Sequence, residues 1–203
     1  MNLPNKITIS RIIFVPIMVM IPFIAPYIGL DKTILYGVKI SNLALLVLFL
    51  VASITDFLDG YIARKYNMVT NFGKFLDPIA DKLLVFTALI MLVETNMIPA
   101  WIPIVIAARE FMVSAIRMVV ASEGTVIAAS MLGKVKTVTQ MVAISFAFLD
   151  INPFMSFMNN ELSGFLLCLN FIMSLAMIVC VIATIWSGLD YLIKSKDVIL
   201  KSK

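Results

Sequence analysis

The sequence of 203 residues contains no histidine, two cysteines and few charged residues, 14% of the total. Without histidine, the commonest metal ligand is missing, so any metal chemistry must rest on carboxylates, which favour hard ions such as Mg²⁺ or Mn²⁺. The cysteines, Cys168 and Cys180, lie about 18 Å apart along one helix, beyond disulfide reach. We predict that both are buried packing residues.

The scarcity of charge also excludes an ordinary soluble domain. Such a domain is about half apolar and a quarter charged, whereas this chain is 62% hydrophobic. A lipid bilayer is therefore the predicted solvent for most of its surface. The net charge of +4 would suggest a nucleic-acid partner in a soluble protein. Here the basic residues flank apolar stretches, so they indicate membrane orientation and we expect no nucleic acid.

Six apolar stretches are long enough to cross about 30 Å of hydrocarbon as helices. They cover residues 8–28, 41–65, 71–94, 99–122, 133–149 and 162–193. The predicted fold class is all-α, an integral membrane protein built as a six-transmembrane-helix bundle. Its length suits a single membrane domain over residues 1–203.

Most basic residues lie in the loops on one side of these stretches. The loops on the other side contain several acidic residues and only two basic ones, Lys32 and Lys39. Because Lys and Arg are retained in the cytoplasm, both termini are predicted to lie on the cytoplasmic side of the cytoplasmic membrane. An even number of spans agrees with this orientation.

Four aspartates form the most informative pattern. Asp56 and Asp59 are three apart, and Asp77 and Asp81 are four apart on the next predicted helix. Each spacing puts a pair on one helix face, and a hairpin turning near residues 68–69 would stack the four in two layers of two. Four carboxylates in a medium of low dielectric constant need cations, so we predict a cytoplasm-facing site with one or two divalent ions.

An ion or proton relay in a transporter is the alternative interpretation of acids inside a membrane. The four aspartates lie towards the cytoplasmic end of their helices, whereas transport sites tend towards the midplane. This position favours a metal site.

Small residues accompany the acids. Gly60 directly follows Asp59, Ala63 lies about one turn after Asp59, and Gly73 opens the next helix, so a ligand could approach the backbone there. Arg64 at the helix end suits a phosphate or an aspartate.

The pattern D-x₂-D-G-x₂-A-R-x₈-G-x₃-D-x₃-D, complete from Asp56 to Asp81, resembles the signature of the CDP-alcohol phosphatidyltransferase family. The opening Pro4-Asn5-x-x-Thr8-x-x-Arg11 is similar to the N-terminal segment of that family. The resemblance implies a metal-dependent enzyme that transfers the phosphatidyl group of CDP-diacylglycerol to an alcohol. It also implies a six-helix membrane bundle that forms a homodimer.

Residue roles follow from the same resemblance. Asp56, Asp59, Asp77 and Asp81 would hold two Mg²⁺ or Mn²⁺ ions, and Asp81 would also be the general base. The residues that would border the nucleotide of CDP-diacylglycerol are Asn5, Thr8, Gly60, Ala63, Arg64 and Gly73.

A second constellation is basic. Arg109 lies deep in the fourth stretch and needs a partner or an anion; the adjacent Glu110 would supply a structural counter-charge. Arg117, Lys134 and Lys136 could equally be ordinary cytoplasmic flanks. However, Gly133 before two lysines at a helix start offers N–H groups and ammoniums to a phosphate.

The patterns A-R-E-x₆-R and G-K-x-K-T-x₂-Q resemble the branch of the family whose acceptor is sn-glycerol 3-phosphate. They imply that Arg109, Arg117, Lys134 and Lys136 bind this acceptor. Two alternatives stay open. One is a related enzyme that uses inositol phosphate, serine or phosphatidylglycerol, and the other is a divalent-cation transporter.

Overall fold

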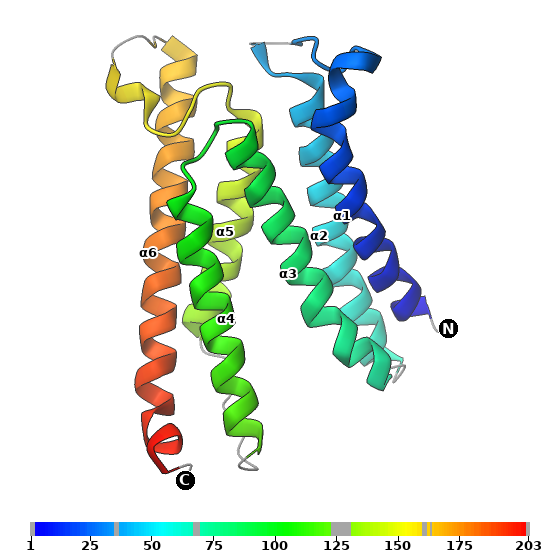
Figure 1. The fold of residues 1–203 in the computed structure, drawn as a ribbon, viewed down its shortest axis with the longest axis vertical. Coiled ribbons are helices and arrows are strands. Elements are labelled where there is room, and N and C mark those ends of the chain that lie inside the picture. The colour runs from blue at the N-terminus through cyan, green and yellow to red at the C-terminus, as the bar shows by residue number, and fades with distance from the viewer. Residues whose placement is uncertain are drawn as a thin grey trace. The chain divides into compact units, whose positions relative to one another are not determined.

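The computed structural model describes residues 3–34, 37–66, 70–122, 131–159, 162 and 164–201. Within these ranges, side chains are not described at positions 3, 4, 6, 57–64, 71, 72, 74, 122, 159 and 197–201. The ordered elements are helical (Figure 1). They are α1 (Leu3–Ile28), α2 (Ile40–Lys65), α3 (Asn71–Glu94), α4 (Trp101–Ser122), α5 (Met131–Leu149), the 3₁₀ helix η2 (Ser156–Asn159) and α6 (Gly164–Lys201).

Each α-helix overlaps one predicted apolar stretch, so the all-α prediction is confirmed. The described ranges contain no β-strand, only an isolated bridge between Thr33 and Lys39. The sixth helix runs further than predicted, to Lys201. Its extension is polar, and an ion pair of 2.8 Å from Lys194 Nζ to Asp190, one turn earlier, supports it.

Among the residues that the structure describes, three helical segments are long and apolar enough to cross a membrane: Ile7–Ile28, Met131–Leu149 and Gly164–Lys196. In α2 the apolar part is shorter, Ile40–Asp56. The helices α2 and α3 carry the aspartate motif, and α4 carries Arg109 and Glu110. These charged residues interrupt the apolar runs of three helices that were predicted as spans.

The chain forms two compact units. The first consists of Met1–Met97 and Ala147–Pro153. In it, α1 packs against both α2 and α3 (Figure 1), and the rings of Phe49 and Phe148 lie 6.4 Å apart. The fully buried side chains of this core include Met18, Leu45, Phe49, Leu84, Leu89 and Leu92.

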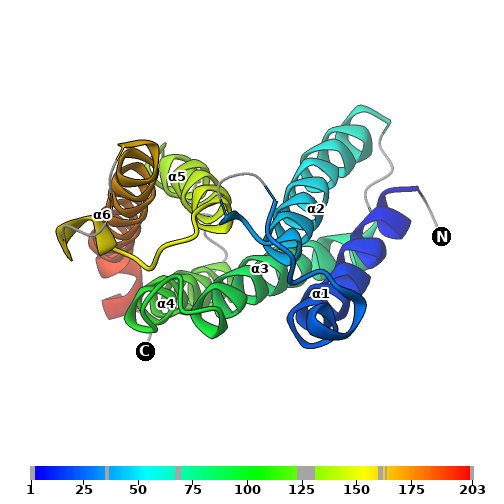
Figure 2. The same ribbon diagram turned by 90° about the horizontal axis from the view of Figure 1, so that it is seen from above.

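The second unit consists of Ile98–Phe146 and Phe154–Lys203. Here α4 packs against α6, as Figure 2 shows from above. Two side chains of α6 hold the segment around η2: Asn170 Oδ1 accepts from the Phe157 amide, and Ser174 Oγ accepts from the Met155 amide, both at 2.9 Å. The core around α4 and α6 contains Val113, Ile116, Val120 and Tyr191.

Both cysteines are free thiols, which agrees with their spacing. Cys180 is buried, as predicted, but the prediction is wrong for Cys168, which is exposed. Cys168 lies on an outward face of α6 beside the exposed Leu167 and Phe171. Apolar residues lie on every side of α6, so hydrophobicity alone does not distinguish its buried face.

Candidate functional site

The first polar cluster is built on the N-terminal part of α1. Asn5, Thr8 and Arg11 are spaced by three residues and therefore share a broad helix face. All three are buried, and the Arg11 side chain is completely inaccessible. Burying an arginine is costly unless an acid pairs with it, so this face of α1 must meet acidic or polar groups of its neighbours.

Those neighbours are the aspartates of the motif. The Arg11 guanidinium forms an ion pair with Asp56 of α2, and Thr8 Oγ1 donates a hydrogen bond of 2.8 Å to Asp77 Oδ1 of α3. Thr8 and Arg11 are one turn apart, so Asp56 and Asp77 lie against the same face of α1. The structure thus brings one aspartate of each sequence pair together around a third helix.

Asn5 takes part in the cap of α3. Thr70 is the N-cap residue, and its Oγ1 accepts from the Gly73 amide at 3.0 Å while donating to Asn5 Oδ1 at 3.0 Å. A Cβ atom on Gly73 would lie 2.9 Å from Asn5 Oδ1 and 3.2 Å from Thr70 Oγ1. This close approach gives a structural reason for glycine at position 73.

For several other predicted residues of the aspartate site, the structure describes the helix but not the side chain. Asp59, Gly60, Ala63 and Arg64 occupy the last turns of α2, but their side chains are among those not described. The same holds for the predicted turn at residues 68–69. Asp81 is partly buried on α3.

The donor set suits a hard divalent ion, because it consists of carboxylate oxygens and lacks imidazole and thiolate. Among the side chains that the structure describes, no three His, Cys, Asp or Glu residues come together as a metal-binding group. Asp59 is not among them. Asp56 and Asp77 each use one oxygen, Oδ1, in the contacts with α1.

The second polar cluster joins α4, α5 and α6. Glu110 Oε1 accepts from two cations, Arg109 Nη1 at 2.9 Å and the Lys136 ammonium. A second guanidinium nitrogen, Arg109 Nη2, donates to Ser187 Oγ of α6 at 2.5 Å. The ionised side chains are at most 17% exposed. Two cations therefore share one buried anion, and the cluster keeps one excess positive charge.

The remaining two predicted acceptor residues lie apart from this cluster. Lys134 is exposed, two residues before Lys136 on α5. Arg117 is also exposed, and its guanidinium carbon lies 5.5 Å from the centre of the Tyr191 ring. Arg109 and Lys136 are thus brought together, whereas Lys134 and Arg117 are placed at the protein surface.

Two participants were not assigned a role from the sequence. From the sequence, Arg11 appears only as the last residue of the N-terminal pattern, and Ser187 has no motif around it. Gly188 follows Ser187, and a Cβ there would lie 3.1 Å from Arg109 Cγ. Two adjacent small residues, Ser187 and Gly188, interrupt a largely apolar stretch of α6. They are the sequence signal that could have indicated a close approach by a polar side chain.

Comparison with known proteins adds a further finding. The family model described as CDP-alcohol phosphatidyltransferase matches residues 1–186. The chain is 46% identical over 207 residues to a CDP-diacylglycerol–glycerol-3-phosphate 3-phosphatidyltransferase of Bacillus subtilis (strain 168), covering 99% of this chain and 98% of the relative. Proteins of the same name from Haemophilus influenzae and Rickettsia felis are 35% and 45% identical. These similarities cover 98% and 71% of this chain, and 96% and 73% of the respective relatives.

Proposed function

Since the chain belongs to the CDP-alcohol phosphatidyltransferase family, we propose that it transfers the phosphatidyl group of CDP-diacylglycerol to sn-glycerol 3-phosphate. The products are phosphatidylglycerophosphate and CMP, so the protein is a transferase of phospholipid biosynthesis. Its similarity to the Bacillus subtilis enzyme over nearly the full length of both chains carries this assignment.

For the metal, we propose that Asp56, Asp59, Asp77 and Asp81 hold two Mg²⁺ or Mn²⁺ ions. The oxygen-only donor set and the position of Asp56 and Asp77 against one face of α1 support this proposal. When bound, the ions neutralise negative charge on the pyrophosphate and on the departing CMP.

The side chains of the chain have separate tasks in the reaction. Asp81 accepts the proton of the primary hydroxyl of glycerol 3-phosphate, whose oxygen attacks the β-phosphorus of CDP-diacylglycerol. A new P–O bond forms as the bond to CMP breaks, and CMP leaves with the electron pair. Asn5, Thr8, Gly60, Ala63, Arg64 and Gly73 border the nucleotide. Most of the acceleration then comes from positioning and electrostatics.

The phosphate of the acceptor is assigned to the basic residues. Arg109 and Lys136 form the buried part of this proposed pocket, and their excess positive charge beside Glu110 supports anion binding. Lys134 and Arg117, both exposed, would attract and contact the same anion from the solvent side.

The wider architecture is proposed on the same basis. We place all six helices across the cytoplasmic membrane, with both termini and the aspartates on the cytoplasmic side, and expect a homodimer. One membrane domain over residues 1–203 is supported by the family match, since residues 1–186 include parts of both compact units.

Release of CMP tests the reaction class. Purified protein in detergent micelles with CDP-diacylglycerol and Mg²⁺ should release CMP only when glycerol 3-phosphate is added, and chelation should stop the reaction reversibly. Asp59→Asn should abolish release, whereas Asp190→Asn on α6 is the matched control and should retain it. Full activity of the Asp59→Asn variant would contradict the metal assignment. Release of CMP without an added acceptor, or no release of CMP at all, would contradict phosphatidyl transfer. Cation transport would then be the function left to test.

A further inference from the structure

A second site is indicated by a cavity of about 470 Å³ inside the first unit. It lies where α1 ends, α2 begins and α3 ends, at the opposite end of these helices from the aspartate motif (Figure 1). Asn42 lines it and precedes Asp56 by fourteen residues, about 21 Å along α2. Its volume lies in the range of small-molecule sites, and its distance from the aspartates makes it a site of its own.

The inner wall of the cavity is polar. Ser41 and Asn42 are 5% and 8% exposed, and both line the cavity. Asn42 is not among the described side chains whose polar atoms are enclosed without a partner, so its carboxamide is open to the cavity that it lines. A carboxamide open to a cavity offers one acceptor oxygen and two N–H donors, so a bound molecule with polar atoms fits this wall.

The charges at the rim favour a ligand with an ammonium group. Lys39 Nζ lies 3.9 Å from Asp31 Oδ1, and both side chains are about half exposed, so this ion pair is weak. Glu94 also lines the cavity and has no ion pair with a described residue. Two acids and one lysine leave one excess negative charge, while Lys39 offers a cation for a phosphate.

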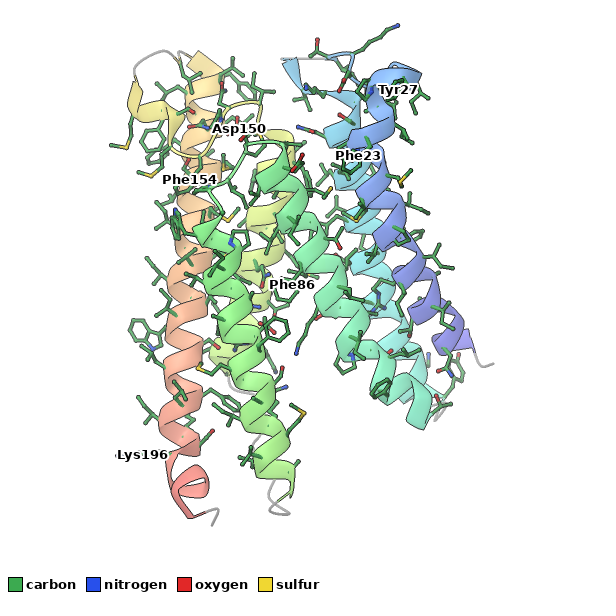
Figure 3. The ribbon with its side chains drawn as sticks, in the orientation of Figure 1. Phe23, Tyr27, Phe86, Asp150, Phe154 and Lys196 are labelled. Carbon is green, nitrogen blue, oxygen red and sulfur yellow. The ribbon has the colours of Figure 1, made fainter. Side chains whose placement is uncertain are left out.

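Apolar groups complete the lining and continue outside it. Pro22, Leu45 and Met97 contribute to the cavity wall. On the same end of α1, Phe23 and Tyr27 are 58% and 88% exposed (Figure 3). The polar cavity thus lies next to an apolar surface of α1. A ligand with a charged headgroup and an apolar body fits this arrangement better than a small soluble amine does.

We propose that this cavity binds the headgroup of a phospholipid that carries a primary ammonium, the phosphoethanolamine type. The ammonium pairs with Glu94, and the phosphate accepts from Lys39 and from the Asn42 carboxamide. The glycerol and the first acyl carbons lie along Pro22 and Phe23. This site does not depend on the proposed transferase activity, because none of its residues belongs to the two polar clusters described above.

Native mass spectrometry of the full chain tests the proposal. The purified protein is mixed in micelles with equal amounts of dioleoyl phosphatidylethanolamine, phosphatidylcholine and phosphatidylglycerol, and the retained lipid is identified. We expect phosphatidylethanolamine to be retained at least about tenfold over the other two, an energy difference of about 1.4 kcal/mol. Water-soluble glycerophosphoethanolamine is the comparison that separates headgroup binding alone from binding of the whole lipid.

Variants connect the retained lipid to the cavity. Glu94→Gln and Asn42→Leu should each lower the preference for phosphatidylethanolamine about tenfold, whereas Asp190→Asn, an acid of the other unit, should not change it. Melting temperatures of the variants identify any that fail to fold, and Glu94→Gln is the safer one because Glu94 is exposed. Equal retention of the three lipids, retention of none, or a preference unaffected by Glu94→Gln would overturn the proposal.

Discussion

At the residue scale, the structure gives Gly73 a role in the cap of α3 because of the nearby Asn5 side chain. A methyl group there would lie 2.9 Å from Asn5 Oδ1, so either Asn5 or the first turn of α3 must move. Gly73→Ala should therefore lower the free energy of unfolding by about 0.5–2 kcal/mol, the range measured for losing an N-cap. Thermal unfolding in detergent measures this change.

Thr70→Ala is the matched comparison, since it removes the capping hydroxyl without adding a methyl group. If Gly73→Ala acts by disrupting the cap, the double variant should lose less stability than the two single losses added together. If the loss of unfolding free energy in the double variant equals the sum of the two single losses, the Gly73→Ala effect does not act through the cap.

At the scale of helices, the link between α4 and α5 depends on Glu110. Its carboxylate compensates the Arg109 and Lys136 cations, of which Lys136 has a side chain only 7% exposed. Glu110→Gln leaves two buried cations without an anion, so we expect a loss of about 3–5 kcal/mol of unfolding free energy. Unfolding of both proteins in the same micelles gives the difference.

Lys194→Gln serves as the control for Glu110→Gln. Lys194 pairs with Asp190 at 2.8 Å, but its side chain is 56% exposed, so losing this pair should cost about 0–1 kcal/mol. Similar losses for the two variants would mean that burial does not strengthen the Glu110 cluster.

The helices were largely predictable from the sequence, because apolar runs of this length have few other solutions in a bilayer. The contacts between them were not. Arg11 looks like a cytoplasmic flank until the packing of α1 on α2 places Asp56 beside it. Glu110 was predictable as a counter-charge for its neighbour Arg109, but Lys136 is 26 residues away and reaches it only through tertiary packing.

At the scale of the whole molecule, the asymmetry of basic residues predicts which loops face the cytoplasm. After replacement of both native cysteines by serine, Tyr66→Cys should resist a membrane-impermeant maleimide in intact cells and react after lysis. Lys32→Cys, in the connection between α1 and α2, should react in intact cells. Both native side chains are exposed, so access across the membrane decides the labelling. The reverse pattern would contradict the cytoplasmic placement of the aspartates.

The central claim, phosphatidyl transfer to sn-glycerol 3-phosphate, is tested most directly by a competition among acceptors. Purified protein receives CDP-diacylglycerol, Mg²⁺ and equal concentrations of glycerol 3-phosphate, glycerol, serine, inositol phosphate and phosphatidylglycerol, and the lipid products are identified by mass spectrometry. We predict phosphatidylglycerophosphate as the dominant product, formed in equal amount to the CMP released. A different phosphatidyl product in excess would contradict the acceptor, and no phosphatidyl product at all would contradict the claim itself.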